Sequence, residues 1–152
     1  MAEKAYNKIL VPYDGSKFSQ KALKMAKILA KAYGSTLYLG TIVEVSDVPP
    51  PGLIRSRETK KTFDQIKNSI RHSVETALEQ REQECKYEGI KVSTHISEGS
   101  ASDELLEFIL KNNIDLVVIG SHGLSGFSKL KALGSVSRKI SELADCPVMI
   151  VR

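Results

Sequence analysis

Short apolar runs alternate with longer amphipathic stretches along the whole chain. Hydrophobic residues stand next to one another in 8–13, 37–45 and 114–119, which is typical of strands buried on both faces. Two further runs, 92–97 and 148–151, are also typical of strands. Between them, apolar residues recur at spacings of three and four, as in amphipathic helices. The order βαβαβαβαβ predicts an α/β fold, with five parallel strands in an open sheet and helices on both faces.

Two helices are predicted in the first part of the chain. The first ends at Gly34, a typical C-terminal cap. The second is long, from about residue 55 to residue 88, and Gly89 ends it. Its apolar residues form one stripe, made of Phe63, Ile66, Ile70, Val74 and Leu78. Three consecutive prolines at 49–51 predict an exposed loop over 46–52.

Two more helices follow in the second part. The third, over 102–112, begins at Ser102, and the two acidic residues after it suit a helix N-terminus. The fourth, from about residue 135 to residue 144, is expected to bury Val136, Ile140 and Leu143. No linker or internal repeat interrupts the pattern, so residues 1–152 are expected to form a single domain.

Composition excludes several classes of protein. No apolar run approaches about 18 residues, so a membrane-spanning helix is not expected. The first residues lack the apolar stretch of a secretory signal, which predicts a cytoplasmic protein. Cys85 and Cys146 form neither a disulfide framework nor a metal motif, and Cys146 is expected to be a buried small hydrophobe.

The formal charge of +4 points only weakly to an anionic partner. The 22 Lys and Arg residues include no dense block with interleaved aromatics, so a nucleic-acid partner is not expected. A small molecule that carries phosphate fits the excess equally well. The motifs must therefore decide between these partners.

The segment after the fourth strand carries most of the candidate chemistry. Gly120, Ser121, His122 and Gly123 follow that strand, and ligands of open parallel sheets bind at the carboxyl ends of strands. Gly134-Ser135 stands where the last helix begins, so free N–H groups and a hydroxyl are available to an anion. The pattern is typical of a phosphate cradle. The alternative is a flexible loop followed by an ordinary serine N-cap.

Two further positions face the same predicted crevice. Asp14 follows the first strand, where its carboxylate could accept hydrogen bonds from a ribose or an adenine amino group. Its alternative role is that of a turn or N-cap residue. The end of the second strand, 41–43, could read a base through its main chain, with sheet core as the alternative. Pro12 donates no ladder hydrogen bond and marks the end of the first strand.

Other sites find no support in the sequence. The chain contains no GxxxxGK[ST] and no GxGxxG after its first strand, which argues against a Walker loop and an NAD fold. His72, His95 and His122 form no ligand cluster, so no metal site is predicted. No Ser/His/Asp or Cys/His set points to a catalytic residue.

Four segments together resemble the universal stress protein family across essentially the whole chain. They are KILVPYDGS (8–16), IDLVVIGSHG (114–123), GSVSRKI (134–140) and CPVMIVR (146–152). The resemblance implies a parallel sheet of order 3-2-1-4-5 and a dimer formed through the fifth strand. It implies, in one subgroup, ATP or AMP, with or without Mg²⁺, held by a G-x-x-G, spacer, G-[ST] motif.

The family's binding residues can be carried onto this chain position by position. Pro12 and Asp14 match the turn that contacts adenosine, and Ile42 matches the hydrophobic residue whose main chain meets adenine. The phosphate-binding positions and those within or beside the motif are Gly120, Ser121, His122, Gly123, Gly134, Ser135 and Val136. One departure is the spacer 124–133, which has ten residues where nine are usual. The extra residue either bulges harmlessly or moves Gly134-Ser135 away from the phosphates.

The resulting hypothesis is a homodimeric, adenine-nucleotide-binding stress-response sensor or regulator. An apolar strand at 148–151 would be awkward at an exposed sheet edge, and pairing with the same strand of a second copy would cover it. Coverage within the monomer is the alternative. Two other functions stay open: a nucleotide-free interaction dimer of the same family, and a slow ATP hydrolase, for which the sequence offers no clear general base.

Overall fold

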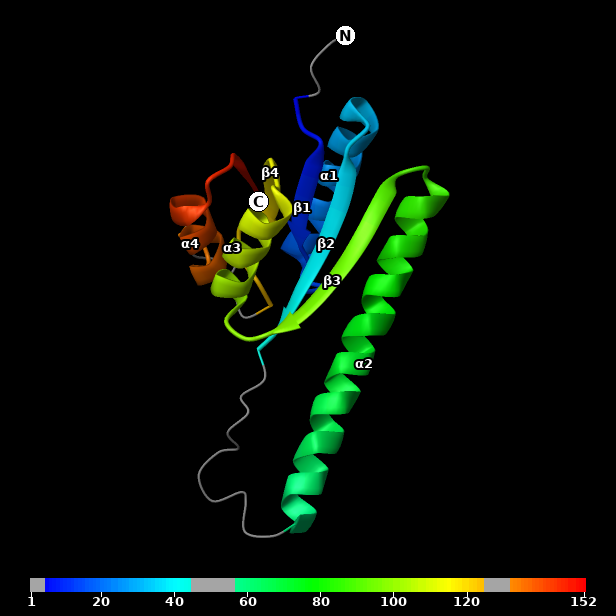
Figure 1. Ribbon diagram of the computed structural model, residues 1–152, viewed down its shortest axis with the longest axis vertical. Helices are drawn as coiled ribbons and strands as arrows, with labels where there is room; N and C mark the ends of the chain where they lie inside the picture. The colour runs from blue at the N-terminus through cyan, green and yellow to red at the C-terminus, as the bar shows by residue number, and fades with distance from the viewer. Residues whose placement is uncertain (1–4, 45–56, 125–131) are drawn as a thin grey trace.

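A computed structural model describes residues 5–44, 57–124 and 132–152. It contains one five-stranded parallel sheet of order β3-β2-β1-β4-β5, as predicted (Figure 1). The strands are β1 (Lys8–Pro12), β2 (Thr36–Val43), β3 (Lys91–Glu98), β4 (Leu116–Gly120) and β5 (Val148–Val151). The helices are α1 (Lys17–Tyr33), α2 (Arg57–Tyr87), α3 (Ala101–Asn112) and α4 (Ser135–Leu143).

The central strand β1 is buried on both faces of the sheet. Ile9 and Val11 point to one face, where they pack in a core with α1 and α2. Leu10 points to the other face, where it packs in a core with α3 and α4. This burial explains why the strand is continuously apolar rather than alternating. Two layers of helices therefore enclose the sheet, and the carboxyl ends of its strands share one edge.

The helix termini follow from local capping chemistry. Ser16 caps α1 by accepting the N–H of Ser19 at 3.1 Å, and Gly34 ends the helix with a φ of 67°. The start of α3 corrects the sequence prediction, because Ser100 and not Ser102 is its N-cap. The acidic residues predicted for that helix lie in its first turn.

The fourth strand begins two residues later than predicted. Ile114 is buried, but its N–H donates to the carbonyl of Ile109 and so belongs to the end of α3. The carboxylate of Asp115 accepts the main-chain N–H groups of Asn7 (2.8 Å) and Lys8 (3.1 Å). The N–H of Asp115 also donates to the carbonyl of Lys8 at 3.1 Å, so Asp115 joins the end of α3 to the start of β1. The strand itself covers Leu116–Gly120.

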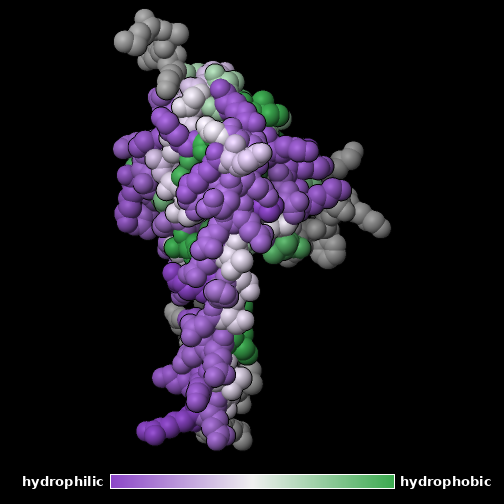
Figure 2. All heavy atoms as spheres, turned by 90° about the vertical axis from the view of Figure 1, so that its right-hand side faces the viewer, coloured by the Kyte–Doolittle hydropathy of each residue, from purple (hydrophilic) through white to green (hydrophobic). Residues whose placement is uncertain are grey.

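The apolar stripe predicted on α2 is wrong for the first half of that helix. Leu78 is buried and Val74 packs against the core, but Ile66 is 53% exposed and Ile70 41% exposed. The reason is length, because α2 extends past the lower end of the sheet (Figure 1). In Figure 2 this projecting part is mostly hydrophilic, with a small hydrophobic area along one side.

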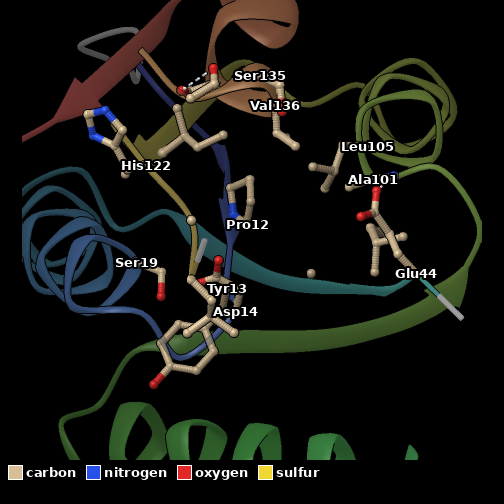
Figure 3. Close-up of a pocket in the computed structure, with 18 residues that line it drawn as sticks. Pro12, Tyr13, Asp14, Ser19, Glu44, Ala101, Leu105, His122, Ser135 and Val136 are labelled. Carbon is tan, nitrogen blue, oxygen red and sulfur yellow. Dashed lines mark hydrogen bonds between the residues drawn. The ribbon is translucent and has the colours of Figure 1, made fainter. Parts of the chain in front are cut away.

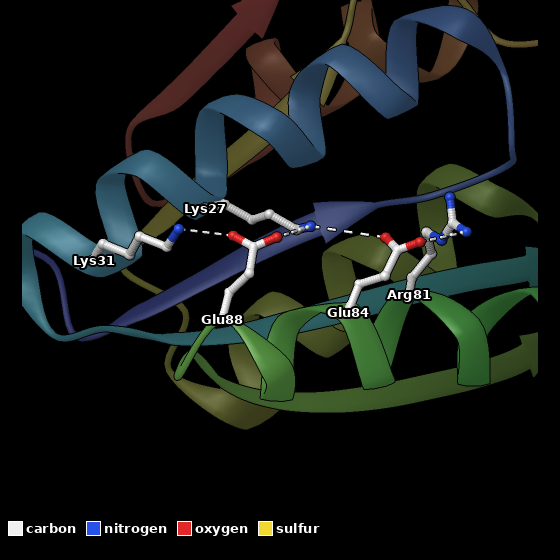
Figure 4. A network of polar contacts seen from close by, with 5 residues as sticks. All are labelled: Lys27, Lys31, Arg81, Glu84 and Glu88. Carbon is white, nitrogen blue, oxygen red and sulfur yellow. Dashed lines mark hydrogen bonds and ion pairs between the residues drawn. The ribbon is translucent and has the colours of Figure 1, made fainter.

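Salt bridges join the last turns of α2 to α1. Glu88 receives the ammonium groups of Lys27 at 2.9 Å and Lys31 at 2.7 Å (Figure 4). These hydrogen bonds, that of Lys31 first, lower the pKa of Glu88 from its usual 4.5 to about 2. Glu84 extends the network, lying 3.8 Å from Lys27 and 2.7 Å from Arg81. The network fixes the two helices side by side on one face of the sheet.

Two expectations near the C-terminal end also change. In α4, Ile140 is fully buried, but Leu143 is 56% exposed and not a core residue. Cys146 is half-buried against the α3–α4 core, less enclosed than predicted. The predicted loop 46–52 lies outside the described residues. In the part of the chain that the structure describes, no helix is long and apolar enough to cross a membrane.

Candidate functional site

A cavity of about 390 Å³ opens at the carboxyl ends of β1, β2 and β4 (Figure 3). The strand order reverses between β1 and β4, which is where open α/β sheets bind ligands. Every predicted site residue except Ser121 lines this cavity: Pro12, Asp14, Ile42, Gly120, His122, Gly123, Gly134, Ser135 and Val136. The fold thus brings together residues that lie more than a hundred positions apart in the sequence.

Ser121 holds the site together from behind the cavity. It is 1% exposed, so its predicted place in the lining is wrong for the described structure. Its carbonyl accepts the N–H of Gly134 at 2.8 Å and the hydroxyl of Ser137 at 2.9 Å. Its own N–H donates to the carbonyl of Val151 at 2.8 Å. Ser121 therefore positions the start of α4 relative to the end of β4.

The ten-residue spacer does not separate the two glycine segments. A side chain built on Gly134 would place its Cβ 3.3 Å from the Ser121 carbonyl oxygen and 3.4 Å from the His122 Cα. The backbone of the two segments is thus in close contact. Whatever path residues 125–131 take, which lie outside the described residues, the ends of the spacer remain adjacent.

The imidazole of His122 is engaged with its own loop. Nε2 lies 2.6 Å from the carbonyl oxygen of Ala132, which can only accept, so Nε2 donates there. Nδ1 lies 3.0 Å from the hydroxyl of Ser121, and the ring stacks at a tilt on Phe18 with centroids 5.2 Å apart. Both ring nitrogens are therefore engaged in hydrogen bonds within the protein, and His122 forms part of the cavity wall.

Gly120, the last residue of β4, and Gly123, in the loop after it, are glycine for two different reasons. A Cβ on Gly120 would lie 2.7 Å from the backbone carbon of Phe18, so α1 can approach β4 only because no side chain is present. A Cβ on Gly123 would lie 3.0 Å from Oδ2 of Asp14, which faces the cavity. Gly120 thus serves helix packing, whereas Gly123 leaves room beside a polar group of the cavity.

Asp14 combines a turn role with an oxygen, Oδ2, that has no hydrogen-bond partner among the described residues. Its Oδ1 accepts the N–H of Ser16 at 2.9 Å, as in an Asx turn, and Ser16 is the residue that caps α1. The N-cap alternative for Asp14 is therefore wrong and the turn alternative is right. Oδ2, on the Gly123 side, is left to face a ligand.

The main chain of Ile42 lies where β1 has already ended. Pro12 pairs with Gly40, the last register pair between β1 and β2, and Tyr13 donates to the Gly40 carbonyl at 2.8 Å. In a parallel sheet alternate residues direct both main-chain groups to the same neighbour. The N–H and C=O of Ile42 consequently face the β1 side, toward the cavity that Ile42 lines.

The first turn of α4 is a helix N-terminus without a cap. Its N-cap is Gly134, which has no side chain, and its first turn contains no acidic residue. Ser135 is exposed at the cavity and lies at the top of the view in Figure 3. Free N–H groups and the positive end of the helix dipole are thus presented to the cavity, an arrangement that suits an anion.

Sequence reasoning missed several cavity residues, of which Glu44 is the most notable. It lies two positions after Ile42, so the alternation of a strand places it on the same face. Its Oε1 accepts the N–H of Ala101, the first residue of α3, at 2.9 Å. The alternation of residues along β2 could have predicted that Glu44 faces the site. Its contact with the start of α3 could not be predicted, because it depends on the tertiary fold.

The histidines lie far apart in the fold. His72 is exposed on α2, and His95 packs from β3 on Phe108 of α3 with ring centroids 4.6 Å apart. Within the described ranges, no group of three or more His, Cys, Asp or Glu side chains could hold a metal ion.

The sequence and the fold both match known proteins. Universal stress protein YxiE of Bacillus subtilis is 35% identical over 150 residues, covering 97% of this chain and 99% of YxiE. Universal stress protein MJ0531 of Methanocaldococcus jannaschii is 32% identical over 150 residues, covering 99% and 84%. The solved structure of universal stress protein UspA from Lactobacillus plantarum has a TM-score of 0.83 and 25% identity, covering 97% and 98%.

Three more distant structures share the fold and hold a nucleotide. A universal stress protein in complex with cAMP has a TM-score of 0.66 at 24% identity, covering 97% of each chain. A universal stress protein from Archaeoglobus fulgidus in complex with dAMP has a TM-score of 0.67 at 19% sequence identity, covering 97% of this chain and 99% of that chain. A universal stress protein family protein from Arabidopsis thaliana with AMP bound has a TM-score of 0.67 at 18% sequence identity, covering 95% of this chain and 90% of that chain. The sequence profile of the universal stress protein family matches residues 5–152, and this chain belongs to that family.

Proposed function

We propose that this protein binds an adenine nucleotide, ATP or AMP, in the cavity at the carboxyl ends of β1, β2 and β4. One observation carries the proposal: the uncapped N-terminus of α4 lines the same cavity as the carboxylate of Asp14 and the main chain of Ile42. An anion site, a hydroxyl acceptor and a main-chain donor–acceptor pair are the three features that a nucleotide needs.

The phosphates would lie against the start of α4. The amide N–H groups of the first turn and the hydroxyl of Ser135 would donate to phosphate oxygens. The contact between Gly134 and Ser121 keeps this helix start at the mouth of the cavity, which weighs against a site disabled by the longer spacer.

The nucleoside would lie toward β1 and β2. Oδ2 of Asp14 would accept hydrogen bonds from ribose hydroxyls, and the N–H and C=O of Ile42 would meet the base. Leu105 of α3 and Ile119 of β4 add apolar surface to the wall, as expected for a site that buries a purine ring.

The nucleotide-bound neighbours support the choice of adenine. The ligands of those three proteins, cAMP, dAMP and AMP, share an adenine base and a phosphate group. When ATP is the ligand, Mg²⁺ would enter on its phosphates, since the described side chains form no metal cluster of their own.

The same proposal includes a homodimer formed through β5. Among the described strands, this one pairs only with β4, and all four of its residues are half-buried. Antiparallel pairing with β5 of a second copy would cover the free edge. The chain, as one domain over 1–152, would then act in the cytoplasm as a dimeric stress-response sensor or regulator whose signal is nucleotide occupancy.

Release of bound ligand tests the nucleotide proposal. Protein purified gently is denatured, and the released small molecules are identified by mass spectrometry. The stripped protein is then titrated calorimetrically with AMP and ATP. We expect an adenine nucleotide in the first experiment and binding of one nucleotide per chain in the second.

A variant with a matched control sharpens the titration. Gly123→Val places a branched side chain against Oδ2 of Asp14 and should abolish binding, whereas Ser93→Val, at an exposed position of β3, should not. No released purine together with no binding at millimolar ATP or AMP would overturn the proposal.

A further inference from the structure

Glu44 brings a carboxylate to the cavity at the end farthest along β2. It lies one residue past the end of that strand and lines the cavity together with Ile42. Oε1 is occupied by the N–H of Ala101 at 2.9 Å. Oε2 has no partner among the residues that the structure describes. A carboxylate oxygen can only accept, so this position calls for a hydrogen-bond donor on the ligand.

The helix starts around the cavity differ in charge, which gives the cavity a direction. The start of α3 carries the carboxylate of Glu44 and two acidic residues in its first turn, Asp103 and Glu104. The start of α4 has neither a side-chain cap nor an acidic residue. In Figure 3, Glu44 reaches toward Ala101 at the right, whereas Ser135 lies at the top. Lys139 of α4 pairs with Asp103 at 2.7 Å, so Glu44 and Glu104 carry the remaining negative charge at the α3 end. The start of α4 is therefore the more favourable place for phosphate.

The chain direction of β2 decides which atom of the base meets Glu44. The N–H of Ile42 precedes its C=O, and the chain then continues toward Glu44. A purine that pairs its N1 with that N–H presents its 6-substituent to that C=O, on the Glu44 side. Residues two apart on an extended chain lie only about 6.5 Å apart, and both line the cavity, so the carboxylate of Glu44 is within reach of that substituent.

We propose that Glu44 makes this cavity selective for purines with an amino group at position 6 over purines with an oxo group there; the proposal rests on the nucleotide binding proposed above. A 6-amino group has two hydrogens, one for the Ile42 carbonyl and one for Oε2 of Glu44. A 6-oxo group offers lone pairs to both and leaves the carboxylate without a donor. The main chain of Ile42 already disfavours a 6-oxo purine, whose N1–H and 6-oxygen would face its N–H and C=O. Hydrogen bonds to charged acceptors are the stronger ones, so Glu44 should add to this discrimination.

The test compares AMP with IMP, which share the ribose and the phosphate. They differ at the purine 6-position and at N1, which accepts a hydrogen bond in AMP and carries an N–H in IMP. Calorimetry gives the ratio of their dissociation constants for the wild-type protein and for Glu44→Gln. Glutamine keeps an oxygen for Ala101 and turns an N–H₂ group toward the base, which can donate to a 6-oxo group. We expect the preference for AMP to fall about tenfold in Glu44→Gln.

The ratio isolates base reading from the other effects of the substitution. Loss of a negative charge changes the affinity for both monophosphates alike, and partial unfolding lowers both. Glu98→Gln is the matched control, because Glu98 ends the adjacent strand opposite Val43, is exposed and does not line the cavity. Its AMP preference should equal that of the wild type.

Three results would overturn the proposal, and they differ in whether nucleotide binding itself remains supported. A Glu44→Gln preference within about twofold of wild type, with AMP still bound, removes the role of Glu44 and leaves nucleotide binding intact. An equal fall in Glu98→Gln assigns the effect to overall charge. Wild-type protein that binds neither AMP nor IMP overturns both this proposal and nucleotide binding.

Discussion

The carbonyl oxygen of Ser121 accepts the main-chain N–H of Gly134 at 2.8 Å, although thirteen positions separate the two residues. The hydroxyl of Ser137 donates to the same oxygen at 2.9 Å. These two hydrogen bonds fix the uncapped start of α4 beside the loop that follows β4. The two glycine segments on either side of the longer spacer are thereby held in contact at the cavity.

Ser137→Ala should loosen this link. Ser137 is 3% exposed, and removing its hydroxyl leaves the Ser121 carbonyl with one donor fewer. We expect a loss of about 1 kcal/mol in the free energy of unfolding, together with weaker AMP binding, because the first turn of α4 is less firmly placed. Urea unfolding and calorimetry measure the two effects. Ser141→Ala, at an exposed serine of the same helix, should change neither, and equal effects in both variants would refute the link.

Gly120→Ala should act on stability through the contact between α1 and β4. Its Cβ would lie 2.7 Å from the backbone of Phe18, so α1 must move away from β4. Overpacking of this kind costs about 1–3 kcal/mol in the free energy of unfolding. Gly134→Ala, whose Cβ would lie 3.3 Å from its nearest neighbour, should cost clearly less. Denaturant unfolding measures the loss in the free energy of unfolding for each variant. A larger loss for Gly134→Ala than for Gly120→Ala would contradict the packing role of Gly120.

Acid should weaken the α1–α2 contact through Glu88. The pKa of Glu88 is lowered from its usual 4.5 to about 2 by hydrogen bonds from Lys31 and Lys27. A lowered pKa in the folded state stabilises the fold above pH 4.5, and this contribution is lost as the pH falls from 4.5 toward 2. The melting temperature of Glu88→Gln should therefore lie below that of the wild type at neutral pH, and the two should converge in acid.

The matched control for this prediction is Glu79→Gln, an exposed carboxylate on the same helix. It should show a smaller difference from the wild type at neutral pH. High salt should reduce the effect of Glu88, because the ion pairs are close to the surface. A Glu88→Gln difference that is independent of pH would show that the charge of Glu88 does not stabilise the fold.

The proposed dimer depends on the outer edge of β5. The carbonyls of Pro147 and Val151 accept hydrogen bonds from β4 and the loop after it, so the alternate residue Ile150 directs its N–H outward. Ile150→Pro should abolish the dimer by removing that donor, whereas Ile150→Ala loses the same side chain and keeps the N–H. Sedimentation measures the mass. A folded Ile150→Pro protein that remains dimeric, or a monomeric wild type, would contradict this interface.

The strands and the core could be predicted because local pattern and tertiary burial agree there, whereas the strand order was predicted only from the family resemblance. Ile9, Leu10 and Val11 are adjacent and apolar, and all three are fully buried in the sheet. The stripe on α2 failed because periodicity reveals which side of a helix is apolar but not where the sheet beneath it ends. Ile66 keeps the spacing of a core residue and is nevertheless 53% exposed.

The candidate site was found through its motif, but the role of each residue depended on tertiary contacts. Gly120 and Gly123 look equivalent in the sequence, yet one makes room for Phe18 and the other for the oxygen of Asp14. Ser121 supports the site from a buried position, as only its contacts with α4 reveal. Glu44 has no motif, since its role arises where the end of β2 meets the start of α3.

The most direct test of nucleotide binding is an amide NMR titration of the full chain with AMP. The proposed site predicts that the amides of Ser135 and Val136 at the phosphate end and of Ile42 at the base end shift in a saturable way. Amides of exposed positions in the last turns of α2, such as Lys86, should stay unchanged. No shift at the cavity up to millimolar AMP, or shifts confined to a surface away from it, would contradict the assignment of this cavity as the nucleotide site.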